Sequence, residues 1–268
     1  IQIMKNKIYA IVLLFLVSVP ALAQWQTKTT IPTQRRQHCA VYYPDGKIYA
    51  WGGWNGTTLL NSLQIYNTSA NTWVTGAATP TAARGSAYCM GSDSAIYQIS
   101  GHASAGKTVN CMRYYPAVNS WCTIADIPNS IWEGSAVSYA GKIFVFGGEA
   151  VISSVATPSD YLQIYDIATN TWSIGTSMPE AKMQHKAVIA GTNVYVFGGR
   201  TGSNGANLST TVYKYSLTSN TWTSLGPIMP SGEKNSFGAC LGPDNKIYLV
   251  GGKDNLSNDG SPFFSTVN

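Results

Sequence analysis

The chain has 268 residues, of which 44% are hydrophobic, 12% aromatic and 11% charged. This composition can bury a sizeable core and excludes an intrinsically disordered chain. The net charge of +5 is spread over single lysines and arginines, so we expect neither a nucleic acid nor an anionic membrane surface as a partner. The 26 Gly, 12 Pro, 16 Tyr and 8 Trp favour short β-strands joined by tight turns, and therefore an all-β fold.

Residues 1–23 have the pattern of a secretory signal peptide. Lys5 and Lys7 precede an apolar run at 8–19, and Ala-Leu-Ala at 21–23 offers a cleavage site. The apolar run is shorter than the roughly 18–20 residues that cross a bilayer as a helix. The sequence therefore predicts export to the periplasm, the cell surface or the medium, with no membrane span after cleavage.

An apolar strand that runs into glycine recurs five times along the chain. The copies are IYAWGG at 48–53, IYQISG at 96–101, IFVFGG at 143–148, VYVFGG at 194–199 and IYLVGG at 247–252. A strand with a central Tyr and then an Asn-x-Trp follow in phase, with the tryptophans at Trp73, Trp121, Trp172 and Trp222. A period of about fifty residues with about four short strands in each unit indicates a repeat protein. The glycine pair predicts a backbone turn where no Cβ fits.

These residues together resemble kelch repeats over roughly 25–268. The WD40 pattern has a similar period, but its recurring Gly-His and Trp-Asp pairs are missing. The resemblance implies a kelch-type β-propeller of four-stranded antiparallel blades, with five repeats visible and the last one incomplete. The expected blades are 33–80, 81–128, 129–179, 180–230 and a partial 231–268.

Residues 24–32 resemble a fourth strand without its first three. Trp25 precedes Pro32 by the same seven residues that separate Trp73 from Pro80. Kelch propellers often close by such borrowing, so this segment is expected to complete the last blade. The sequence is also expected to stop inside that blade.

No catalytic or cofactor signature stands out, since the nucleophile elbow, the zinc-protease motif, the P-loop and the dinucleotide fingerprint are all missing. We therefore expect no cofactor. In kelch propellers, the loops after the glycine pair and the connections into the next blade face one end of the central channel. The resemblance then implies a rim made of Trp54, Asn55, His102, Glu149, Arg200 and Lys253 from the first set and Arg36, Arg84, Trp132, Met183 and Lys234 from the second, with Glu133 beside Trp132.

Cations, aromatic rings and two carboxylates at such a rim suit an acidic peptide or a glycan. The sequence alone leaves other interpretations open. The same residues could be solvated loop tips with salt bridges between blades. Glu133 and Glu149 could instead act as acid and base in a sugar mutarotase or epimerase, or the chain could be a structural repeat domain of a larger surface protein. As a binding module, it should keep its ligand when either glutamate is changed to glutamine.

Two smaller patterns complete the sequence interpretation. His38 and His185 both lie six residues after their Pro, but Ser86, Gly134 and Ser236 take that position in the other repeats, so no metal site is expected. Five cysteines leave at least one unpaired within the chain. Cys111 and Cys122 are close in sequence on strands expected to be neighbours, and they form the possible disulfide.

Overall fold

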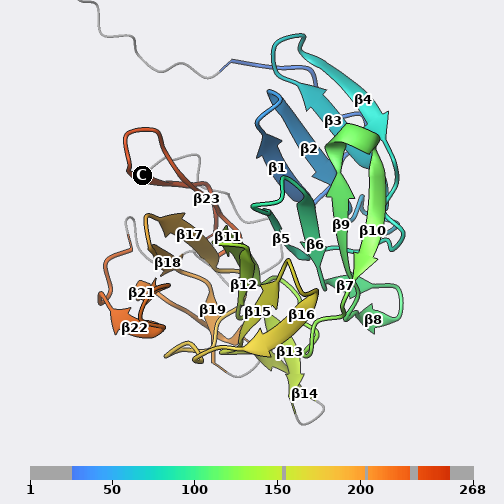
Figure 1. The fold of residues 1–268 in the computed structure, drawn as a ribbon. Coiled ribbons are helices and arrows are strands. Elements are labelled where there is room, and N and C mark those ends of the chain that lie inside the picture. Colours follow the sequence, from blue (N-terminus) through green and yellow to red (C-terminus); the bar gives the residue numbers. More distant parts are fainter. Residues whose placement is uncertain (1–25, 153–154, 203–204, 230–234, 254–268) are drawn as a thin grey trace, which may run out of the picture.

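The computed structural model describes residues 26–152, 155–202, 205–229 and 235–253, and nearly all regular structure in them is β-strand (Figure 1). A short 3-10 turn lies at Pro116–Val118. The predicted all-β fold is thus confirmed. No helix in the described ranges is long and apolar enough to cross a membrane.

The strands form four complete antiparallel sheets and part of a fifth, which we call blades one to five. Blade one contains β1 (Cys39–Tyr43), β2 (Lys47–Trp51), β3 (Leu63–Asn67) and β4 (Thr72–Gly76); blade two contains β5 (Ala87–Met90), β6 (Ile96–Ile99), β9 (Cys111–Tyr115) and β10 (Ser120–Ile124). Blade three contains β11 (Ser135–Tyr139), β12 (Lys142–Phe146), β15 (Leu162–Asp166) and β16 (Thr171–Ile174); blade four contains β17 (Lys186–Ala190), β18 (Asn193–Phe197), β21 (Tyr213–Ser216) and β22 (Thr221–Ser224). Blade five contributes β23 (Gly238–Leu241) and β24 (Ile247–Val250).

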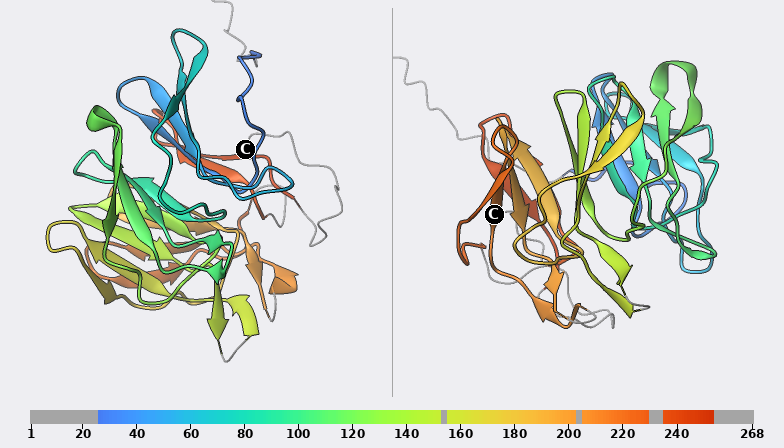
Figure 2. Two further views of the ribbon diagram at one scale, coloured as in Figure 1. Left: turned by 90° about the vertical axis from the view of Figure 1, so that its right-hand side faces the viewer. Right: turned by 60° about the horizontal axis from the view of Figure 1, so that its bottom comes forward.

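Consecutive blades lie side by side through their first strands. β1 contacts β5, β5 contacts β11, β11 contacts β17, and β17 contacts β23. The blades therefore follow one another in chain order around a common axis (Figure 1), and Figure 2 shows the same chain from two other sides. Three small hairpins project from the second-to-third strand loops: β7 (His102–Ala103) with β8 (Gly106–Lys107), β13 (Glu149–Ile152) with β14 (Val155–Pro158), and β19 (Arg200–Thr201) with β20 (Asn207–Leu208).

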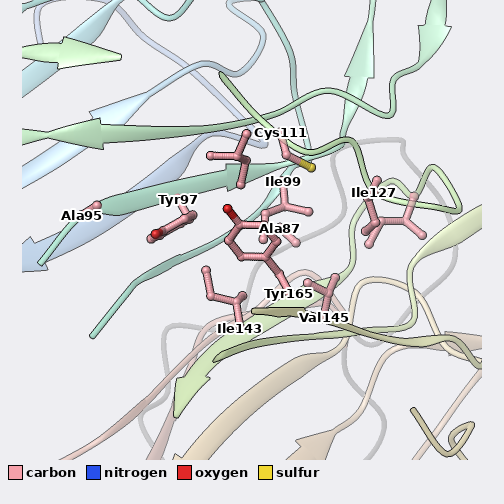
Figure 3. Close-up of a cluster of buried hydrophobic side chains, with 11 residues drawn as sticks. Ala87, Ala95, Tyr97, Ile99, Cys111, Ile127, Ile143, Val145 and Tyr165 are labelled. Carbon is pink, nitrogen blue, oxygen red and sulfur yellow. The ribbon is translucent and has the colours of Figure 1, made fainter. Parts of the chain in front are cut away.

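Aromatic and aliphatic side chains fill the spaces between blades. Between blades two and three, Tyr97 and Ile99 pack against Ile143, Val145 and Tyr165, all with at most 1% of their surface exposed (Figure 3). The Tyr97 and Tyr165 ring centroids lie 6.0 Å apart in a tilted arrangement, which aromatic pairs favour. An isolated sheet could not bury both faces, and stacking of the blades supplies the missing cover.

The repeated Tyr, Asn and Trp connect each outer hairpin to the segment before its blade through hydrogen bonds and ring contacts. In blade two, Tyr114 donates to Asn119 Oδ1 at 2.8 Å, and its ring lies 5.0 Å from that of Trp121. Asn119 has a left-handed φ of 49°, which asparagine tolerates better than most residues. The Trp121 indole then donates to the Ala77 carbonyl at 2.9 Å, in the connection after blade one. The same three contacts recur in blades one, three and four, with the residues Tyr66, Asn71, Trp73, Tyr165, Asn170, Trp172, Tyr215, Asn220 and Trp222.

Thr29 shows where the N-terminal segment lies. It accepts the Trp73 indole N–H at 2.9 Å, as Ala77 accepts from Trp121 and Thr176 from Trp222. Thr29 thus takes the position that follows the fourth strand of a blade preceding blade one. Residues 26–32 nevertheless form no strand, because no described strand runs alongside them to pair with.

The predicted disulfide between Cys111 and Cys122 is not formed, and both thiols are free. The β9 and β10 pairing sets Cys111 opposite Ile124 and Cys122 opposite Arg113. The two cysteines are therefore diagonal neighbours, about 7–8 Å apart in a typical sheet. A disulfide needs Cβ atoms only about 3.5–4.5 Å apart. The two strands are neighbours as expected, but their register keeps the two cysteines apart, so the predicted disulfide was wrong.

Candidate functional site

The glycine pairs position the rim by letting two backbones approach closely. The second glycine of each pair has φ between +93° and +113°. A Cβ on Gly53 would lie 2.7 Å from the Arg36 carbonyl oxygen and 2.9 Å from the His38 Cβ, so only glycine fits there. In blade two, Ser100 replaces the first glycine with φ of 55°, and its hydroxyl donates to the Ile131 carbonyl at 2.8 Å.

This close approach brings the two predicted sets of rim residues together, one pair in each blade. The pairs are isolated antiparallel bridges: Arg36 with Trp54, Arg84 with His102, Trp132 with Glu149, Met183 with Arg200, and Asn235 with Lys253. The Asn55 carboxamide oxygen accepts the N–H groups of Thr57 and Thr58 in its own loop, and its backbone carbonyl accepts from the Gln34 side chain at 3.4 Å. Lys234 lies outside the described residues.

Blade five is shifted by one residue relative to the predicted phase. Asn235, rather than Lys234, pairs with Lys253, and a Cβ on Gly252 would meet Phe237 as a Cβ on Gly53 would meet His38. Phe237, rather than Ser236, therefore shares the position of the two histidines. The constant offset from Pro fails here because the connection into blade five holds one more residue.

Directly after each rim pair, one residue of each blade joins a hydrogen-bonded arc around the axis. Its members all have left-handed φ between 54° and 60° and are Gln37, Gly85, Glu133, Gln184 and Ser236. From Gly85 onward, the N–H of each member donates to the carbonyl of the member in the preceding blade, from 2.7 Å for Gly85 to 3.3 Å for Ser236. This arc places the side chains of three members, from blades one, three and four, in the middle of the ring.

The Arg84 guanidinium lies between two tryptophan rings of the rim. The guanidinium carbon lies 5.5 Å from the Trp54 ring centroid and 5.3 Å from the Trp132 ring centroid, so two indoles from neighbouring blades enclose it. The His102 ring meets Trp132 edge-on at 5.5 Å. Arg84 Nε, His102 Nδ1 and Trp132 Nε1 are each shielded from solvent without a partner in the described part of the chain.

The two candidate carboxylates have separate partners. Glu149 forms an ion pair with Lys107 at 2.9 Å. Glu133 accepts one amide N–H from Gln37 and one from Gln184, each at 2.5 Å, which bridges the channel from blade one to blade four. Burial raises the pKa of Glu133, and nearby Glu149 adds to the rise while the two amides oppose it. Glu133 and Glu149 therefore share no hydrogen-bond or ion-pair partner within the described structure.

This bridge helps to line a cavity of about 180 Å³, whose walls come from all five blades. Lys186 and His185 line it from blade four, and Tyr88 lines it from blade two. His185 is 1% exposed with neither ring nitrogen hydrogen-bonded in the described structure. Its burial lowers its pKa to about 3, so the ring is neutral. Within the described ranges, no group of three or more His, Cys, Asp or Glu could hold a metal ion.

The sequence interpretation missed Gln37, Gln184 and Lys186. A signal was present in the repeat phase, since Gln37, Glu133 and Gln184 all lie five residues after their Pro. Lys186 lies seven after its Pro, where blades one to three have the small residues Cys39, Ala87 and Ser135. Comparing the repeats column by column would have found a polar cluster at one position and a single long cation two positions later.

Known proteins similar to this chain agree with this architecture. The sequence model of the Attractin/LZTR1 β-propeller family matches residues 6–260. Kelch-like protein 25 of Xenopus tropicalis is 26% identical over 242 residues, which cover 84% of this chain and 38% of the relative. Kelch-like protein 35 of Mus musculus is 23% identical over 248 residues, 92% of this chain and 40% of the relative. The chain thus spans about two fifths of the length of these relatives.

A solved structure shows the same fold. The structure of YjhT superposes with a TM-score of 0.75 at 17% sequence identity, and the match covers 91% of this chain and 84% of that one. The predicted kelch-type propeller is therefore confirmed. The chain belongs to the Attractin/LZTR1 β-propeller family and is a kelch-repeat β-propeller protein.

Proposed function

We propose that this propeller binds a protein ligand at its rim and that Arg84 receives an acidic side chain of that ligand. Kelch propellers are generally protein-binding modules. The observation that carries the proposal is the enclosure of the Arg84 guanidinium between Trp54 and Trp132. It makes no ion pair with the described acidic residues, so its terminal N–H groups remain available to a carboxylate.

An enclosed guanidinium is well prepared for a carboxylate. Arginine and carboxylate pair through two parallel hydrogen bonds, and a side chain fixed in advance loses less conformational entropy on binding. Arg36, Arg200 and His102 add donors or positive charge nearby, while Lys107 neutralises Glu149. The rim therefore favours an anionic partner.

The same geometry favours a protein ligand over a glycan. Sugars bind proteins by stacking on exposed aromatic faces, and Trp54 and Trp132 each turn a face to Arg84. The guanidinium occupies those faces. A glycan thus has less aromatic surface available than the two tryptophans suggested.

Selection of random displayed peptides on the immobilised protein tests this proposal. We expect enrichment of peptides with Asp or Glu, and loss of their binding in Arg84→Met. Arg113→Met is the matched control, because Arg113 also lies over an aromatic ring, Tyr115 at 5.2 Å, but on β9 away from the rim bridges. Enriched peptides without acidic residues, or equal binding by Arg84→Met, would refute it. A glycan array run in parallel reports the other ligand class.

We also propose that the protein acts outside the cytoplasm, on the support of the signal-peptide pattern at 1–23. Those residues lie outside the described part. Expression of the full chain followed by N-terminal sequencing of exported protein should find Gln24 as the first residue. An uncleaved chain retained with the cytoplasmic fraction would contradict export.

A further inference from the structure

Lys186 breaks the repeat at a position that the other blades keep small. It is the first residue of its inner strand, where it pairs with Phe197 of β18. The first residues of the other inner strands, in the same register, are Cys39, Ala87, Ser135 and Gly238. One blade of five thus extends a long cation from a position that otherwise carries a short side chain or none.

The Lys186 side chain crosses the channel. Its ammonium lies over the Tyr88 ring of blade two, 5.9 Å from the ring centroid, and it lines the 180 Å³ cavity with Glu133. Within the described ranges the ammonium donates no hydrogen bond and has no carboxylate oxygen within 4.0 Å. Burial lowers the pKa of Lys186, while Cys39 and Glu133 nearby act in the opposite direction.

The cavity thus has donors and acceptors that do not meet each other. An ammonium offers three donors, and a half-buried cation without an acceptor is unfavourable. Across the cavity, Glu133 is held by two amides and keeps lone pairs for a further donor. A ligand that satisfies both sides needs one anionic group for Lys186 and at least one hydroxyl for Glu133. Because Glu133 repels a second negative charge, a monoanion fits better than a dianion.

We propose that this cavity binds a small hydroxylated monocarboxylate, with its carboxylate on Lys186 and a hydroxyl donating to Glu133. The cavity volume of about 180 Å³ limits the ligand to a few carbon atoms. Buried and unpartnered His185 adds a further polar group on the same wall. This site is separate from the rim site on Arg84, and it does not depend on that function.

Two ligands that differ only in hydroxyl groups test the proposal on the unmodified protein. D-glycerate and propionate share a three-carbon skeleton and a carboxylate, and ligand-observed NMR measures the affinity of each. We expect glycerate to bind at least about tenfold more tightly, because propionate supplies no donor for the remaining lone pairs of Glu133. No binding of glycerate, or equal affinity of the two acids, would overturn the proposal without any variant being made.

Variants then locate the site. Lys186→Met should weaken glycerate binding by at least about tenfold, and Glu133→Gln should reduce the preference for glycerate over propionate. Lys142→Met is the matched lysine control. Lys142 is half exposed and forms an ion pair with Asp166, and it lies at the end of β12 that is opposite to the glycine pair. Glycerate binding that survives Lys186→Met would place the ligand elsewhere and refute the site. Peptide binding at the rim, measured on Lys186→Met, should not change.

Discussion

Lys182 and Lys186 lie four residues apart in blade four, yet their surroundings are opposite. Lys182 is 0% exposed, and its ammonium donates to the Gly198 carbonyl, the Ser209 hydroxyl and the Thr211 carbonyl at 2.6–3.2 Å. Glu180 lies 3.0 Å away and neutralises it. Lys186 has none of these partners in the described structure and lines the channel cavity.

This difference distinguishes a buried polar group that stabilises the fold through internal hydrogen bonds from one that is available to a ligand. Lys182 donates to carbonyls of the segment between β18 and β21 in blade four. Arg35 does the same in blade one, where it donates to the Gly52 and Ser62 carbonyls between β2 and β3. A basic clamp in two blades indicates a structural role. Lys186 has no counterpart in the other described blades and no acceptor among the described residues, which fits the binding role we propose for it.

The largest expected effect is the loss of the Lys182 clamp. Lys182→Met should lower the free energy of unfolding by about 3 kcal/mol, because it leaves buried acceptors without donors. Lys186→Met should change the same quantity by less than about 1 kcal/mol, because no internal hydrogen bond is lost. Urea unfolding of the two variants measures both. Equal losses would mean that the two lysines do not differ as described.

The buried side chain of His185 should make the free energy of unfolding depend on pH. Its pKa is about 3 in the folded protein, against a usual value of 6.5. Above pH 6.5 the ring is neutral in both states. Below it the unfolded chain binds the proton first, and the free energy of unfolding falls by about 1.4 kcal/mol for each pH unit down to about pH 3.

The variant His185→Phe, which copies Phe237 of blade five, should remove this part of the slope. Urea unfolding between pH 7 and pH 4 compares the variant with the unmodified protein. The same slope in both would show that His185 is protonated in the folded state.

A substitution of Gly85 tests the position of the Trp132 indole at the rim, with a smaller expected loss of stability than Lys182→Met. A Cβ there would lie 2.2 Å from Trp132 Nε1 at a φ of +60°, so Gly85→Ala should displace the indole and lower the free energy of unfolding by about 1–2 kcal/mol. Gly141→Ala is the matched control, with φ of +76° but no atom within 4 Å of the added Cβ. Near-ultraviolet circular dichroism should change only in Gly85→Ala. Identical spectra and stabilities would exclude the indole contact.

The repeat pattern predicted most of the fold because each repeated residue has a local task. The glycines after β2, β12, β18 and β24 allow the close backbone approach, and Tyr114, Asn119 and Trp121 bond within one hairpin or to the adjacent blade. The resemblance to kelch repeats also led us to expect both rim sets at one end of the channel, and in blades one to four the structure bridges their members in pairs.

The remaining contacts could not be predicted from phase. Arg84 needs one tryptophan from each neighbouring blade, and Glu133 meets glutamines of blades one and four. Such contacts depend on the radius of the ring and on side-chain rotamers, neither of which the period encodes. The single extra residue before Asn235 likewise lay outside the repeat rule.

The affinity of an acidic peptide for the rim tests the central claim most directly. Tryptophan fluorescence can follow the titration, since Trp54 and Trp132 enclose Arg84. We predict that a selected peptide binds Arg84→Met at least about tenfold more weakly than the unmodified protein, while Arg113→Met binds it unchanged. Equal dissociation constants for all three proteins would contradict a carboxylate-binding rim.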